Sequence, residues 1–259
     1  MHPATRTFLL SATAFLLLTP ACQQQPQKAA PVPGIEPTPA EGIIGRRRQQ
    51  PLPPQKAEMA VIFVGGFTEQ VLLHFRKAYE NMPLLPCTGK QLRAYYAWDS
   101  GTGNLLFHST WKLQRDLTAF CKLNPRADIV LIGHSYGGSA IMDALRHLKE
   151  PHGRILVATI DPVSRRKKSQ PRQRPAGVDY WVNTYCYPYR NIRDGFARAG
   201  GPWRHCEQAD VNLNFPGTRR DADGDRYAHV YPEPMLTEPH PDTGKSVFDL
   251  LSARLTPAL

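Results

Sequence analysis

The segment Gly133-His134-Ser135-Tyr136-Gly137 fits the pattern G-x-S-x-G, which can make its serine a nucleophile. The apolar run "ADIVLIGHS" precedes the serine and the helix-like run "GGSAIMDALRHLKE" follows it, which predicts a sharp strand-to-helix turn. Gly133 and Gly137 have no side chains to clash with the strand and the helix in such a turn. The start of a helix behind Ser135 also favours negative charge that develops on a substrate oxygen. The alternative is a glycine-rich turn that serves close packing alone.

The elements that must position Ser135 alternate between strand-like and helix-like patterns. Short apolar runs bounded by polar or glycine residues predict strands, and apolar residues at helical spacing predict helices. Such alternation favours an α/β fold with a mostly parallel central sheet and helices on both faces. The expected strands are 60–66, 92–100, 127–135, 154–163 and 178–186, and the expected helices are 68–82, 105–123, 137–150 and 243–255.

The stretches "GHSYGG" and "ILVATIDPV" resemble the α/β-hydrolase superfamily, especially its lipase and esterase branches, over roughly residues 60–240. The resemblance implies the α/β-hydrolase fold and the chain order nucleophile, acid, histidine. The Asp-Pro pair after "ILVATI" matches the lipase stretch that carries the acid, which points to Asp161. Some lipases take the acid from beyond the following strand. Asp194 is therefore the main alternative, with Asp179 and Asp210 behind it.

A serine hydroxyl needs a base, and a histidine oriented by the acid is the usual one. His229 follows the polar loop "DADGD" and precedes a final helix, as the histidine of this family does. His205 and His240 also come after the acid and remain alternatives. His134, inside the turn itself, is expected to point away from Ser135.

Two backbone N–H groups are needed to hold the oxyanion that forms during attack on a carbonyl. One belongs to the residue after the nucleophile, Tyr136. The second belongs to the turn after the first strand, where Phe67 is preferred and Gly66 is the alternative.

The N-terminal residues have the pattern of an exported precursor. Arg6 precedes a short apolar run, which predicts a signal peptide over residues 1–21. The stretch "LLLTPAC" resembles the lipobox of bacterial lipoproteins, which implies acylation of Cys22 and a lipid anchor facing the periplasm or the cell surface. A secreted protein cut nearby and an uncleaved anchor are the alternatives. Residues 22–57 are rich in Pro and Gln and predict a disordered tether, which leaves 58–259 for the folded domain.

Four cysteines follow the predicted tether, an even number in an oxidising compartment. Two disulfides are therefore expected. Chain order favours Cys87–Cys121 and Cys186–Cys206 over the remaining pairings.

The composition and the motifs together favour hydrolysis of a lipid or phospholipid ester. The formal net charge of +10 favours anionic partners such as phospholipid headgroups, and export argues against nucleic acid. No cofactor is needed for this chemistry. No metal is expected, since in the loop that starts with "DADGD" Arg226 stands where a calcium loop requires glycine, and Pro232 stands at the final acidic position. A small-molecule esterase or thioesterase, or a non-catalytic envelope lipoprotein that binds a ligand, are the alternatives.

Overall fold

The computed structural model describes residues 50–66, 74–97, 111–164 and 173–256, all of which belong to one compact unit of the chain. The predicted signal peptide, Cys22 and the tether up to residue 49 lie outside the described residues.

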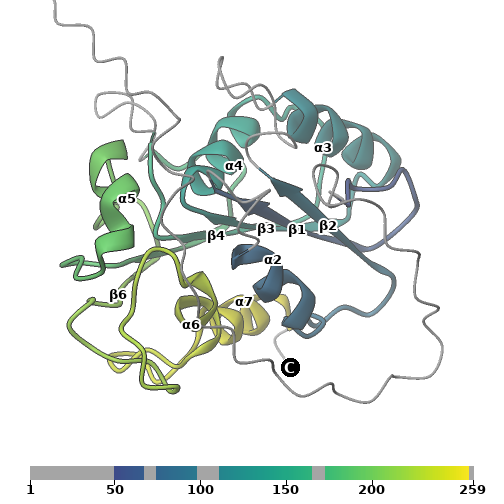
Figure 1. The fold of residues 1–259 in the computed structure, drawn as a ribbon. Helices are drawn as coiled ribbons and strands as arrows, with labels where there is room; N and C mark the ends of the chain where they lie inside the picture. Colours follow the sequence, from purple (N-terminus) through teal and green to yellow (C-terminus); the bar gives the residue numbers. More distant parts are fainter. Residues whose placement is uncertain (1–49, 67–73, 98–110, 165–172, 257–259) are drawn as a thin grey trace, which may run out of the picture. The chain divides into compact units, whose positions relative to one another are not determined.

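The described residues form one sheet of six strands in the order β2-β1-β3-β4-β5-β6, and every neighbouring pair is parallel (Figure 1). The predicted parallel sheet with helices on both faces is confirmed. Its strands are β1 (Met59–Gly65), β2 (Gln91–Ala97), β3 (Asp128–His134), β4 (Ile155–Ile160), β5 (Tyr180–Tyr185) and β6 (Val211–Asn214).

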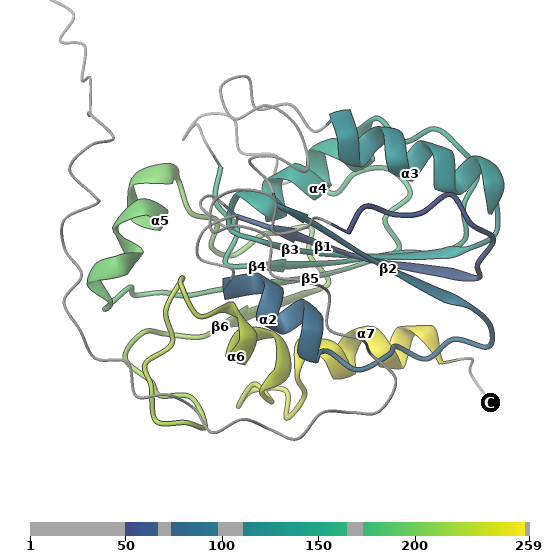
Figure 2. The ribbon, with the colours of Figure 1, turned by 45° about the vertical axis from the view of Figure 1, so that its right-hand side comes forward.

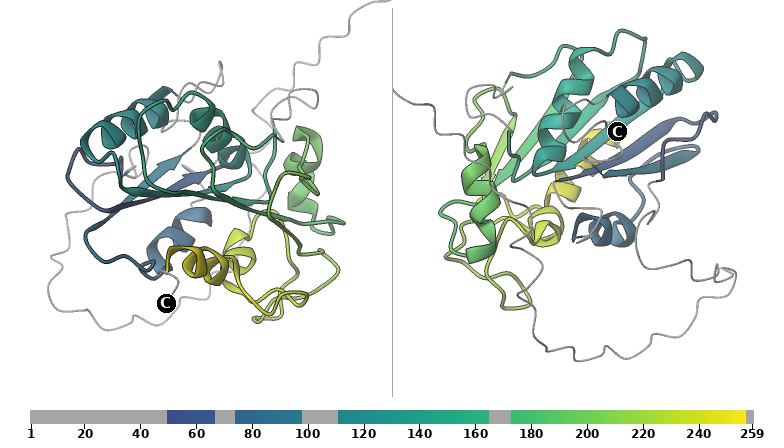
Figure 3. Two further views of the ribbon diagram at one scale, coloured as in Figure 1. Left: turned by 180° about the vertical axis from the view of Figure 1, so that it is seen from behind. Right: turned by 45° about the horizontal axis from the view of Figure 1, so that its top comes forward.

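Helices cover both faces of the sheet, as the views from the side and from behind show (Figures 2 and 3). α3 (Trp111–Leu123) and α4 (Tyr136–Arg146) pack on one face. α2 (His74–Asn81), α6 (Pro232–Thr237) and α7 (Val247–Leu255) pack on the opposite face. No helix in the described part of the chain combines the length and the apolar composition that crossing a membrane requires.

The strands in the middle of the sheet read as continuous apolar runs because both of their faces are covered. All seven residues of β1 are buried. Ile62 packs in the cluster shared with α3 and α4, whereas its neighbour Phe63 packs in the cluster shared with α2, α6 and α7. Alternate side chains thus supply two cores, which fixes the register of the sheet.

The folded unit begins earlier along the chain than the expected start at residue 58. Gln50 pairs with Tyr95 of β2 through main-chain hydrogen bonds of 2.8 and 3.0 Å. Leu52 is buried in the cluster of α3 and α4. The Pro-rich composition of residues 22–57 therefore did not reveal that the end of this stretch packs along the edge strand β2.

The second half of the unit contains short elements that the apolar patterns did not predict. β6 has only four residues, of which Leu213 alone is fully buried. η2 (Ile192–Asp194) and α5 (Gly195–Gly200) form a short helical segment between β5 and β6. Elements this short offer too few residues for a period of 2 or 3.6 to stand out.

The expected disulfides are absent: no bond joins Cys87, Cys121, Cys186 and Cys206 to one another. The expected pairings would need contact between side chains that pack in different clusters. Cys121 and Cys206 belong to the cluster on the α3 and α4 face, whereas Cys87 and Cys186 pack on the opposite face. The sheet lies between the two members of each expected pair.

Candidate active site

The candidate site lies where the strand order changes direction. β1 is followed in the chain by β2 on one side, and the chain then returns to place β3 on the opposite side of β1. The carboxyl ends of β1 and β3 border the crevice in which open α/β sheets bind their ligands. Ser135 follows the last residue of β3 and precedes the first residue of α4.

Ser135 sits on the sharp turn that its sequence pattern predicts. Its backbone has φ 56° and ψ −127°, a positive-φ conformation that a side chain makes unfavourable. The turn closes against the sheet so tightly that a Cβ on Gly137 would lie 2.1 Å from the carbonyl oxygen of Val64. A Cβ on Gly133 would lie 2.7 Å from the carbonyl oxygen of Gly137. Only glycine fits at these two positions.

Hydrogen bonds on both sides hold the turn to the segment after β4. The N–H of Ser135 donates to the carbonyl of Ile160 at 3.0 Å, and the N–H of Val163 donates to the carbonyl of Ser135 at 3.0 Å. Asp161 lies between these two partners and has φ 41°. Ser135 and Asp161 are the two non-glycine residues with positive φ in the described part of the chain.

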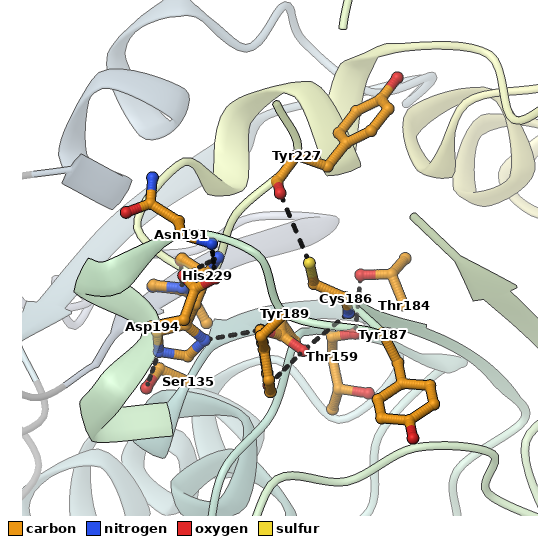
Figure 4. A network of polar contacts seen from close by, with 12 residues as sticks. Ser135, Thr159, Thr184, Cys186, Tyr187, Tyr189, Asn191, Asp194, Tyr227 and His229 are labelled. Carbon is orange, nitrogen blue, oxygen red and sulfur yellow. Dashed lines mark hydrogen bonds and ion pairs between the residues drawn. The ribbon is translucent and has the colours of Figure 1, made fainter. Parts of the chain in front are cut away.

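The structure brings the side chains of Ser135, His229 and Asp161 together. Ser135 Oγ lies 2.8 Å from Nε2 of His229 (Figure 4). Nδ1 of His229 lies 2.7 Å from Oδ2 of Asp161. A carboxylate oxygen accepts, so Nδ1 carries the proton and the lone pair of Nε2 faces the serine hydroxyl. All three residues are buried, and Asp161 has no exposed surface.

Two further donors hold the Asp161 carboxylate. The main-chain N–H of Cys186 donates to Oδ1 at 2.9 Å. The hydroxyl of Tyr189 lies 3.1 Å from Oδ1 and 3.0 Å from Oδ2. Burial, and then the charge of Asp161, raise the pKa of Tyr189, so its hydroxyl remains a donor at neutral pH. These bonds fix the plane of the carboxylate that faces His229.

The backbone of His229 is held as firmly as its ring. Its N–H donates to Oδ1 of Asp194 at 2.9 Å, and its carbonyl accepts from Nε2 of His134 at 2.8 Å. The ring of His134 also packs against the ring of His229, with the centroids 4.8 Å apart. Sequence reasoning places His134 away from Ser135 but gives no sign of this second contact, because a G-x-S-x-G pattern does not specify what its variable residues touch.

Asp194, the alternative acid, faces the main chain of His229 rather than its ring. Its Oδ2 accepts from the N–H of Asn191 at 3.2 Å, so both carboxylate oxygens bind main-chain donors. Burial raises the pKa of the Asp194 carboxyl above its ordinary value. The structure therefore places two buried carboxylates around one histidine, with different contacts.

Two further aspartates and two further histidines that follow Ser135 in the chain have separate contacts. Asp179 accepts from the N–H of Ile155 at 2.7 Å, and Asp210 accepts from the N–H of Trp181 at 2.7 Å. His240 is buried, with Nε2 2.9 Å from the carbonyl of Asn214, and His205 is exposed. The structure joins none of these four to Ser135.

Of the two residues expected to hold the oxyanion, Phe67 lies outside the described residues. Tyr136 is the first residue of α4, directly after Ser135. Gly66, the alternative to Phe67, lies so close to Ser135 that a Cβ on it would be 2.5 Å from the Cβ of the serine. The backbone after β1 thus runs past the Ser135 side chain.

The polar loop at residues 221–225 closes on itself. Asp221 accepts from the N–H of Asp225 at 2.8 Å, which completes a turn. Within the described ranges, no group of three or more His, Cys, Asp or Glu side chains could hold a metal ion.

Comparison with protein families decides the family. Residues 61–256 match the model described as "Alpha/beta hydrolase family". The chain belongs to the alpha/beta hydrolase family. A search of curated proteins found no match to this hydrolase-family chain. Among solved structures, it matches that of LpqC, a poly(3-hydroxybutyrate) depolymerase from Bordetella parapertussis, with 13% sequence identity and a TM-score of 0.34. That match covers 62% of this chain and 73% of the depolymerase.

Proposed function

We propose that the protein is a serine hydrolase that cleaves carboxylic esters, with Ser135, His229 and Asp161 as its catalytic triad. The observation that carries the proposal is the unbroken line of contacts at 2.8 and 2.7 Å from Ser135 Oγ through the imidazole to the Asp161 carboxylate. The strained backbone of Ser135 adds support, because such strain gathers at functional sites.

In the proposed reaction, Ser135 Oγ attacks the ester carbonyl while Nε2 of His229 takes the hydroxyl proton. The imidazolium then returns this proton to the leaving alcohol, which departs as an acyl-enzyme forms. Asp161 holds Nδ1–H and stabilises the imidazolium. His229 then takes a proton from a water molecule, which attacks the acyl-enzyme. As the carboxylic acid departs, the imidazolium of His229 returns the proton to Ser135 Oγ. The main-chain N–H groups of Tyr136 and Phe67 are proposed to hold the oxyanion.

The proposed substrate is a lipid or phospholipid ester. The proposed location is the bacterial cell envelope, with the chain exported and anchored by a lipid on Cys22. The support comes from the signal-like N-terminus and the net charge of +10. If Cys22 is acylated, Cys22→Ser releases the protein from the membrane fraction and abolishes incorporation of labelled palmitate. Membrane retention and labelling that persist in this variant would contradict the anchor.

A fluorophosphonate probe tests the triad directly, because it reacts only with an activated serine. We expect the full-length chain to be labelled, and Ser135→Ala and His229→Ala to be unlabelled. His205→Ala is the matched control, since this exposed histidine lies outside the site, and it should label as the parent does. A folded parent that resists labelling would refute the proposal. Nitrophenyl esters of increasing acyl length then separate a lipase from an esterase for short, soluble substrates.

A further inference from the structure

The connection between β5 and β6 presents apolar side chains to solvent. Five large hydrophobic residues are exposed in the described part of the chain, and three of them fall within residues 187–196 of this connection. Ile192 is 88% exposed and Phe196 is 54% exposed. Ile192 begins the 3-10 helix η2, and Phe196 is the second residue of α5, which follows it directly. Tyr187, 42% exposed, is the third.

Cationic side chains alternate with these apolar ones along the chain. Arg190, Arg193 and Arg198 are exposed in the same stretch. The one acidic residue of 187–204, Asp194, is buried and turned inward to the main chain of His229. The exposed side of this connection therefore combines apolar groups with positive charge. We call it the cationic–apolar face, made up of Tyr187, Arg190, Ile192, Arg193, Phe196 and Arg198.

The cationic–apolar face lies at the candidate site. Asp194, between Ile192 and Phe196, contacts His229 (Figure 4). Tyr187 directly follows Cys186, whose N–H donates to Asp161. In Figure 1, α5 lies beyond one end of the sheet rather than within either helical layer. A surface bound by this face would meet the protein at the rim of the site.

We propose that the cationic–apolar face docks the protein on an anionic lipid surface. Arginines near such a surface each strengthen partitioning about fivefold, while apolar side chains enter below the headgroups. A soluble polyanion would use the arginines but leave Ile192 and Phe196 in water. A second copy of the chain would bring the same positive charge against itself. The proposal deepens the proposed lipid-ester hydrolysis and rests on it for the role of docking, but binding to lipid is measured without catalysis.

A tryptophan placed at position 196 reports whether this face enters the membrane. Phe196→Trp is made in the full-length chain with Cys22→Ser, which removes acylation. The probe is a vesicle of phosphatidylglycerol and phosphatidylcholine with brominated acyl chains, which quench tryptophan on contact. Leu84→Trp is the matched control, since Leu84 is 67% exposed but lies in the connection that leads into the opposite end of the sheet at β2.

We expect the fluorescence added by Trp at 196 to be quenched by brominated lipid and that added by Trp at 84 to stay unquenched. Quenching reports how deeply one side chain enters the membrane. Attachment of the protein through its N-terminal segment would therefore not produce the expected difference between positions 196 and 84. Equal quenching at the two positions, or none at 196, would overturn the proposal.

Vesicle binding by surface variants supplies the second measurement. Ile192→Ser with Phe196→Ser should weaken partitioning at least tenfold, and Arg193→Gln with Arg198→Gln should weaken it only on anionic vesicles. Unchanged partitioning in both double variants, or tight binding to heparin that depends on the arginines alone, would contradict lipid docking. Fluorophosphonate labelling of these variants should equal that of the parent. If the parent itself is not labelled, the proposal of a serine hydrolase is refuted, whereas the proposal that the cationic–apolar face binds lipid is unaffected.

Discussion

Aspartates at the two ends of the parallel strands accept the same kind of hydrogen bond in different surroundings. At the amino ends of the strands, which we call the amino edge of the sheet, Asp128, Asp179 and Asp210 each accept a main-chain N–H at the start of a neighbouring strand. At the carboxyl edge, Asp161 and Asp194 also accept main-chain N–H groups, those of Cys186 and His229.

The difference lies in what else surrounds the carboxylates. Asp128 and Asp210 pair with Arg154 and Arg174, and their side chains keep 17% and 32% of their surface exposed. Asp161 and Asp194 have no exposed surface, and both face His229. The amino edge thus pairs its charges near solvent, whereas the carboxyl edge buries two carboxyl groups around one imidazole. Such an arrangement is unfavourable for folding alone and suits a histidine that gains positive charge during a reaction.

The largest expected effect is that of Asp161→Asn. The amide can donate to Nδ1, which would place the proton on Nε2 and leave the histidine unable to accept from Ser135. We expect kcat to fall about 10⁴-fold while the fold is kept. Ester hydrolysis by the purified variant, beside its far-ultraviolet circular dichroism, checks this. Asp194→Asn is the matched control, and a greater loss there than at Asp161 would exchange the roles of the two acids.

Asp194→Asn should have a smaller effect on the rate and a distinctive dependence on pH. The amide oxygen can still accept the N–H of His229, but the negative charge is gone. The imidazolium is then less stabilised, so we expect kcat/KM to fall about tenfold and its acid limb to move to lower pH. A pH–rate profile that keeps its acid limb in place would reduce Asp194 to a structural hydrogen-bond acceptor.

The free energy of unfolding of Asp194→Asn should also depend on pH differently from that of the parent. Because burial raises the pKa of Asp194, folding favours its protonated form. This contribution is present in acid, below the unfolded value near 3.8, and is lost as pH rises through the higher folded value. Asparagine does not titrate. The free energy of unfolding of the variant, relative to the parent, should therefore rise as pH increases from acid to neutral in urea denaturation.

Tyr189→Phe should weaken the support of Asp161 without removing it, since the N–H of Cys186 and the His229 ring still bind the carboxylate. Loss of a hydrogen bond to a charged group costs about 1.5–3 kcal/mol of stability, and we expect kcat to fall severalfold. Tyr187→Phe, at an exposed tyrosine two residues away, is the control and should change neither quantity. Equal effects of the two substitutions would show that the Tyr189 hydroxyl has no special role.

The smallest effect on activity is expected at the amino edge, from Asp128→Asn. Its bonds to the N–H and guanidinium of Arg154 are partly exposed, so the free energy of unfolding should fall by about 0.5–1 kcal/mol. Hydrolysis should stay within about twofold of the parent. A loss of activity like that of Asp194→Asn would erase the distinction between the two edges.

The features that can be predicted from the sequence depend on local signals. The strands β1, β3 and β4 are buried on both faces, so their apolar runs stand out, and the Ser135 turn is marked by glycines that no other residue can replace. Chain order and neighbouring motifs select Asp161 and His229, and in the structure Asp161 contacts His229, which contacts Ser135.

The features that cannot be predicted depend on contacts across the fold. Tyr189 reaches Asp161 over 28 positions, and His134 reaches the carbonyl of His229 over 95. Neither contact leaves a periodic or spaced pattern. The prediction of disulfides is wrong for a related reason: counting cysteines says nothing of the sheet that lies between them.

The positive φ of Ser135 has a consequence for how such a protein could change over generations. Glycine adopts this backbone conformation without strain, whereas a serine in the same conformation is strained by about 1–3 kcal/mol. Ser135→Gly would therefore relieve this strain while it removes the proposed nucleophile. If selection for the reaction were relaxed, the relief of backbone strain would favour this substitution. The resulting protein would keep the crevice and could bind a ligand without reacting with it.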